Sequence, residues 1–90
     1  MSEFAIVHLE LSNKQEKAHK IFVEPWGDEL EIPQGAIWRL ESDSTGYGVV
    51  RVELHPQGLA VYGLSRTNMR ITSAGKTIWE SFQPVDPPTD

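Results

Sequence analysis

Three histidines, His8, His19 and His55, are the first side chains in this sequence that could do chemistry. Imidazole is the commonest ligand of transition metals in proteins, so three rings could in principle form a metal site. None of them stands at a metal-ligand spacing from another. His8 falls within an expected strand, and His55 begins a turn where its ring should be solvated. We therefore predict structural histidines and no metal site.

Four carboxylates in eight residues form the second candidate group, around the glycine turn at Gly27. They could bind calcium or a basic partner, but their spacing matches no calcium loop. As an acid and base pair, two of them would share one strand face, without a pocket to shift their pKa values. We expect a solvated acidic face and keep these residues as candidate binding positions: Glu24, Asp28, Glu29 and Glu31.

Nucleophilic catalysis has little support in the sequence. Cysteine is absent, which removes thiolate chemistry and Cys-based zinc sites together. Ser65 lies in Gly-Leu-Ser-Arg, which lacks the second glycine of a nucleophile elbow. There is also no glycine-rich loop that could hold a phosphate. We predict no catalytic residues and no cofactor.

Trp26 is the aromatic residue with two open interpretations, because it lies in a turn between Pro25 and Gly27. An exposed aromatic side chain in a loop is a candidate anchor for a partner. Alternatively, Trp26 could fold over one end of the domain as a plug. Further aromatic residues could line a cavity or an interface, although two of the tryptophans are expected in the core: Trp38, Trp79, Tyr47 and Tyr62.

The elements that must position these residues are short β-rich segments separated by turn residues about every ten positions. This pattern is typical of a sandwich or barrel and not of βαβ units. Several segments alternate apolar and polar residues, which indicates strands with one buried face. We expect about eight antiparallel strands, with connections short enough for sequential pairing but with no strand order given by the sequence, at residues 4–11, 19–24, 29–32, 36–42, 50–54, 59–64, 68–72 and 77–82.

The expected domain spans residues 1–83. It contains two predicted turns and one connection for which two structures are open. His55-Pro56-Gln57-Gly58 has the residue order of a type I hairpin turn, and Ala74-Gly75 should make a tight connection. Ser12 and Gln15 have the spacing of a capping box, so one turn of helix is an alternative to a loop there. Residues 84–90 are rich in proline with little to bury, and we expect a flexible tail.

The segment from Gly27 to Trp38 resembles the second sequence motif of the cupins, in which a metal-binding histidine follows a proline-glycine turn. Gly27, Pro33 and Gly35 fall on this pattern, and Trp38 occupies the histidine position. Where the family often has an asparagine, this chain has Ser42, and the first cupin motif is not found upstream. The resemblance implies a jelly-roll-like barrel or sandwich with the metal site removed.

Residues 22–40 also resemble a group of short bacterial proteins of unknown function that share an EPWG-like segment followed by a proline-glycine turn. This resemblance implies a shared fold. It implies no activity.

The charge of the chain restricts its partners. The 90 residues carry a net charge of −5, and residues 1–43 hold nine acids against four bases. Such a chain repels phosphate backbones and anionic membranes, so we expect neither nucleic acid nor membrane as a partner. A basic protein or a cation fits better. The first residues lack a signal-peptide pattern and cysteine is absent, so we expect a cytoplasmic protein.

These observations favour a non-catalytic interaction or ligand-binding module that uses the end near Trp26 or an exposed sheet face. A homodimer is a further expectation, because an open sheet leaves edges that must be covered or paired. One alternative is an acidic inhibitor or immunity-type protein that binds a basic partner through Glu24 to Glu31. Another is a small cupin-like enzyme with a degraded metal site.

Overall fold

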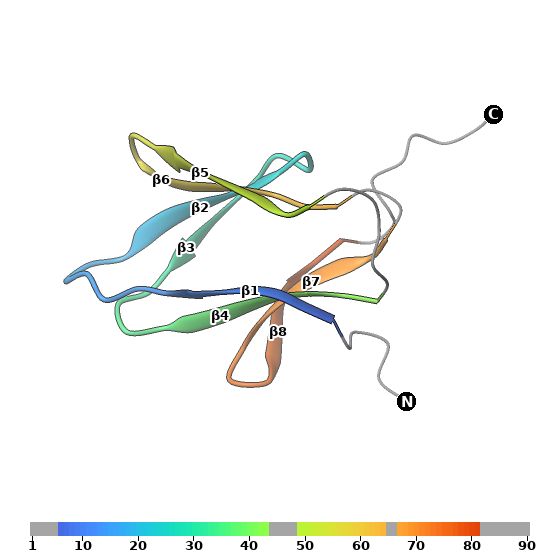
Figure 1. The fold of residues 1–90 in the computed structure, drawn as a ribbon. Helices are drawn as coiled ribbons and strands as arrows, with labels where there is room; N and C mark the ends of the chain where they lie inside the picture. Colours follow the sequence, from blue (N-terminus) through green and yellow to red (C-terminus); the bar gives the residue numbers. More distant parts are fainter. Residues whose placement is uncertain (1–5, 44–48, 65–66, 82–90) are drawn as a thin grey trace.

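The computed structural model describes residues 6–43, 49–64 and 67–81, and these residues form two four-stranded sheets packed face to face (Figure 1). The all-β class and the eight strands are confirmed, and the described residues form a sandwich without a closed barrel. Tyr47, Ser65 and the expected tail at 84–90 lie outside the described residues. The strands are β1 (Ile6–Ser12), β2 (His19–Glu24), β3 (Asp28–Ile32), β4 (Ile37–Ser42), β5 (Arg51–His55), β6 (Gly58–Tyr62), β7 (Met69–Ser73) and β8 (Lys76–Glu80).

The strand order shows that the chain crosses between the sheets. One sheet has the order β1-β4-β7-β8 with antiparallel neighbours, and the other has the order β3-β2-β6-β5. In the second sheet β2 and β6 run parallel, so the expectation of antiparallel pairing throughout is wrong for this pair. A parallel neighbour needs a long crossover connection. Here the connection from β2 to β6 passes through β3, crosses to β4 in the other sheet and returns through the β5–β6 hairpin.

The core lies between the sheets and follows the alternation of apolar residues along the strands. Trp38 is only 5% exposed, which confirms its predicted place in the core. Burying a large aromatic side chain contributes several kcal/mol before entropy is subtracted, at about 25 cal/mol per Å². The other fully buried apolar side chains of the cluster come from both sheets: Ile21, Val23, Ile32 and Val61 on one side, and Leu40, Met69 and Ile71 on the other, with Leu64 beyond β6.

The proline-glycine turn carries the chain from β3 in one sheet to β4 in the other. The Ala36 amide donates to the Pro33 carbonyl over 3.1 Å, and Gly35 has φ of 79°. This is the geometry of a type II turn, which requires positive φ at its third residue. The predicted bend is therefore present, and it delivers Trp38 to the core.

The β5–β6 hairpin has the predicted two-residue loop, since His55 is the register partner of Gly58. Gly58 has a second role, because β6 also pairs with β2. A Cβ atom at this position would lie 2.0 Å from the Lys20 carbonyl oxygen. Only glycine therefore allows the parallel pair to approach at this point, which places the hairpin tip beside the start of β2.

Candidate functional site

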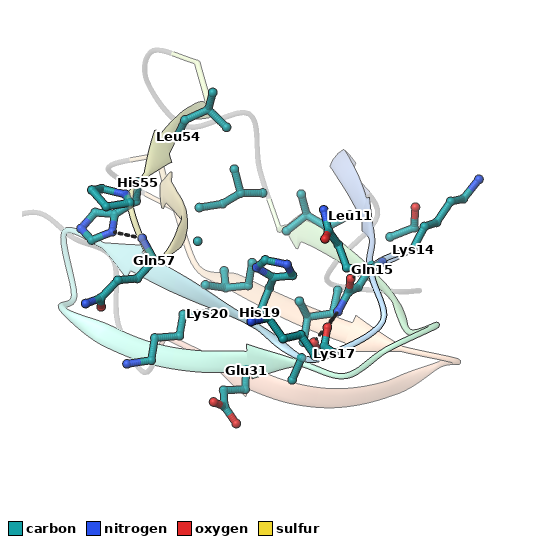
Figure 2. A pocket seen from close by; sticks show the side chains of 18 residues that line it. Leu11, Lys14, Gln15, Lys17, His19, Lys20, Glu31, Leu54, His55 and Gln57 are labelled. Carbon is teal, nitrogen blue, oxygen red and sulfur yellow. Dashed lines mark hydrogen bonds between the residues drawn. The ribbon is translucent and has the colours of Figure 1, made fainter.

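A cleft of about 810 Å³ opens at the end of the sandwich where the β1–β2 connection and the β5–β6 hairpin lie (Figure 1). Its walls come from the end of β1, residues 13–18, the start of β2, the end of β3 and the β5–β6 hairpin (Figure 2). The parallel pairing of Lys20 with Gly58 holds two of these walls together. A concave site of this size is in the range of pockets that bind small molecules.

Asn13 fixes the wall formed by residues 13–18. Its side chain donates to the carbonyls of Lys17 and Ile32, each over 2.9 Å, and its Oδ1 accepts from the Gln15 amide over 2.9 Å. Its main chain is bonded to the turn before β4, with Asn13 N donating to Ala36 O and Gly35 N donating to Asn13 O. The alternative helical turn from Ser12 is therefore not formed, because Asn13 directs these backbone groups into a side-chain-bonded loop.

His19 contributes the polar group at the centre of the cleft. Figure 2 shows its ring near the middle of the lining side chains. Its Nε2 atom is buried and has no hydrogen-bond partner among the described residues. A buried polar atom without a partner costs about 1–3 kcal/mol, so such an atom beside a cleft marks a position where a ligand atom would be favourable.

The charges along the cleft are mainly positive, although the chain as a whole is acidic. Lys14 and Lys17 stand on the loop wall, and neither forms an ion pair with any described residue. Lys20 is engaged with Glu29 over 3.2 Å. Among the described residues that line the cleft, Glu31 is the one carboxylate. This local balance favours an anion, whereas the overall composition suggested a cation or a basic partner.

An apolar surface completes the cleft. Leu54 on the β5–β6 hairpin is 91% exposed and stands at the mouth of the cleft (Figure 2). Deeper lining residues are buried or half-buried aliphatic side chains: Leu11, Ile21, Ile32 and Leu59. Burial of Leu54 alone by a ligand would contribute about 1.5–3 kcal/mol. The cleft therefore offers an apolar surface next to an unpaired imidazole nitrogen and a basic wall.

Trp26 lies at the other end of β2 and is half-buried. Its ring meets the Trp79 ring edge-on, with centroids 5.0 Å apart and an angle of 71° between the planes. It also covers Gly63, since a Cβ there would lie 2.5 Å from the Trp26 ring. This arrangement matches the plug interpretation of Trp26 better than the exposed anchor.

The four acidic candidate residues are distributed over different contacts. Asp28 accepts a hydrogen bond from Trp79 Nε1 over 2.7 Å, and Glu29 is paired with Lys20. Glu31 is exposed at the end of β3 beside the cleft, and Glu24 is half-buried at the end of β2. No group of three or more His, Asp or Glu side chains within the described residues could hold a metal ion.

The other two histidines have local partners. His8 Nε2 lies 2.6 Å from Ser42 Oγ, and burial lowers the pKa of His8. Ser42 is fully buried, so this serine-histidine pair offers no nucleophile to a substrate. The His55 ring packs against the Phe22 ring with centroids 4.4 Å apart and an angle of 42° between the planes, and its Nδ1 accepts from the Gln57 amide.

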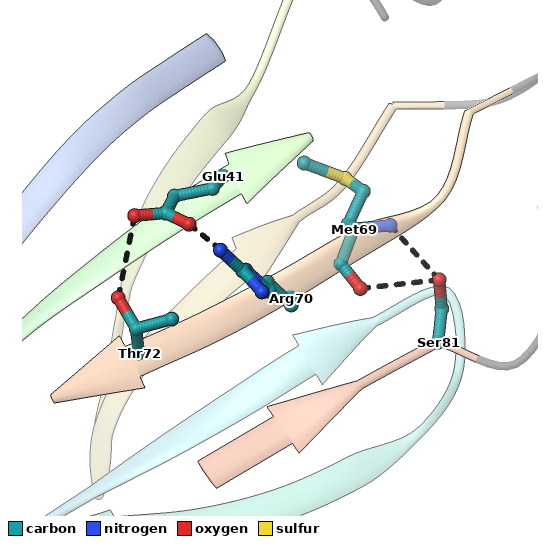
Figure 3. Close-up of polar contacts among 5 residues, drawn as sticks. All are labelled: Glu41, Met69, Arg70, Thr72 and Ser81. Carbon is teal, nitrogen blue, oxygen red and sulfur yellow. Dashed lines mark hydrogen bonds and ion pairs between the residues drawn. The ribbon is translucent and has the colours of Figure 1, made fainter. Parts of the chain in front are cut away.

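A second hollow of about 550 Å³ lies on the outer face of the other sheet, and its charged groups are already paired. Glu41 is nearly buried there; it accepts from Arg70 Nε over 2.9 Å and from the Thr72 hydroxyl over 3.4 Å (Figure 3). Arg39 is paired with Glu10 over 3.3 Å. The charged side chains that line this hollow within the described residues are therefore all paired, and the His19 cleft is the better candidate.

Comparison of the chain with protein-family models, curated proteins and solved structures gave no match. In the described residues, no helix is long and apolar enough to span a membrane.

Proposed function

We propose that this chain is a non-catalytic binding module and that its ligand is a small anion with an apolar part, bound in the cleft at His19. The observation that carries the proposal is the buried, unpartnered Nε2 of His19 beside an open cleft. Rotation of an imidazole ring about χ2 is soft, so the ring can present Nε2 to a bound ligand.

The basic residues of the loop wall and the apolar residues of the cleft recognise different parts of the ligand. Lys17 and Lys14 attract the anionic group, while Leu54 and the aliphatic floor cover the apolar part. The overall charge of −5 disfavours long polyanions, so the ligand is a compact anion and not a nucleic acid.

Octanoate and octanol test the proposal, because they share one tail and differ in charge. We expect octanoate to bind more tightly in calorimetry and to shift the amide signals of His19 and Gly58 in NMR spectra. Lys17→Gln should weaken octanoate binding, and Lys76→Gln, at the distant β7–β8 turn, should leave it unchanged. Equal binding of both probes would overturn the anionic part of the proposal, and no shift at about 1 mM would overturn the site.

The acidic inhibitor remains the alternative from a different class. Fewer carboxylates are available for this function, because Asp28 and Glu29 already have partners within the chain. It predicts binding to a basic protein that weakens steeply with salt and is indifferent to substitution of Lys17.

A further inference from the structure

Three of the four sheet edges carry a feature that discourages pairing with another chain. β1 has a bulge between Val7 and Leu9, and β8 has one at Ile78, which is skipped between the partners of Ile71 and Thr72. β3 presents three carboxylates in five residues, so two copies of it centred on Glu29, Leu30 or Glu31 would place like charges opposite each other. Bulges and charges of one sign are common protections of edge strands.

β5 is the remaining edge, and it has neither protection. It pairs with β6 alone among the described strands, and that pairing is regular over five residues (Figure 1). All five of its residues are exposed, including the apolar Val52 and Leu54. An exposed edge strand with apolar residues and no bulge is a template for a further strand.

The sequence of β5 is complementary to itself in the antiparallel register centred on Val52. When Val52 lies opposite Val52 of a second copy, Arg51 lies opposite Glu53 of that copy, and the symmetry repeats this pair. The same register places Leu54 opposite Val50 of the second copy. Shifting the centre to Arg51 or to Glu53 would place like charges opposite each other, which is destabilising.

We propose that β5 pairs with β5 of a second copy of this chain, antiparallel and centred on Val52, to form a continuous eight-stranded sheet. A two-fold axis normal to the sheet relates the copies, which is the commonest symmetry of homodimers. In the dimer, Val50 of the second copy extends the apolar wall that Leu54 gives to the cleft. The proposal is independent of the identity of the ligand.

Charge reversal tests this register in trans. Arg51→Glu makes the strand wholly acidic and Glu53→Arg makes it wholly basic, so each variant should raise its own homodimer Kd about tenfold or more. A mixture of the two variants should dimerise, because each Glu then faces an Arg. Loss of a contact inside one chain cannot explain rescue by a second chain.

Sedimentation velocity measures the outcome, since the 10.1 kDa chain would form a dimer of about 20 kDa. Glu16→Arg, the same charge change on the β1–β2 connection, is the matched control and should leave the wild-type Kd unchanged. A wild-type chain that stays monomeric at about 1 mM would overturn the proposal. So would variants that dimerise as well as the wild type, or a mixture that remains monomeric while each variant is monomeric.

Discussion

The side-chain amide of Asn13 donates to the main-chain carbonyl of Ile32 over 2.9 Å and thereby ties the β1–β2 connection to the end of β3. The same nitrogen donates to Lys17 at the other end of the loop. One buried side chain thus determines where the basic wall of the cleft stands. The architecture of the site depends on a residue that carries no charge.

Asn13→Asp should lower the free energy of unfolding by about 2 kcal/mol or more, because a carboxylate has no donor for the two carbonyls. Urea unfolding measures the loss, and Lys14→Ala on the same loop serves as the control with little effect. A loss below about 0.5 kcal/mol would contradict the role assigned to the side chain.

Gly63→Ala should destabilise the other end of the sandwich by about 1–3 kcal/mol through overpacking. The added methyl would lie 2.5 Å from the Trp26 ring and 2.8 Å from the Met69 sulfur. Chemical unfolding gives the loss, and near-UV circular dichroism reports any change in the contact between Trp26 and Trp79. In a protein that already carries Trp26→Leu, Gly63→Ala should lower the free energy of unfolding by a smaller amount. An equal cost in both backgrounds would mean that the ring is not the obstacle.

The strands could be predicted from the sequence because alternation and turn residues are local properties. β2 forms at the predicted residues 19–24, and Pro33 and Gly35 make the predicted bend. The cleft could not be predicted in this way. It joins His19 to Leu54 through the parallel pair of β2 and β6, which sequential antiparallel pairing does not produce.

Two further features of the site were missed for physical reasons. Alternation at residues 50–54 indicated a buried face, but β5 is an edge strand and leaves Leu54 exposed. Asn13 had a local signal, since an asparagine can accept a hydrogen bond from the amide two residues later. That signal indicates a turn at Gln15, but it does not reveal the donation to Ile32.

Ala74→Asn should stabilise the protein by about 1 kcal/mol. Ala74 has φ of 52° and Gly75 has φ of 80° in the two-residue turn between Ser73 and Lys76. Positive φ strains alanine, whereas asparagine tolerates it, and Asn-Gly is the preferred pair for such hairpins. Thermal unfolding measures the gain. Ala74→Val should act in the opposite direction, and a neutral or destabilising asparagine would show that the turn is not strained.

His8 should make the protein less stable in mild acid. Burial lowers the pKa of His8 below its ordinary value of 6.5, so the unfolded chain binds a proton more readily than the folded chain. The stability that the protein gains from a neutral His8 is therefore fully present above about pH 6.5. It is lost as the pH falls from there through the lower pKa that His8 has in the folded state. His8→Gln keeps a polar group near Ser42 but does not titrate. Urea unfolding at about pH 7.5 and about pH 5.5 should show a smaller loss of stability in this variant than in the wild type. If both proteins lose the same amount, the acid sensitivity arises from another group.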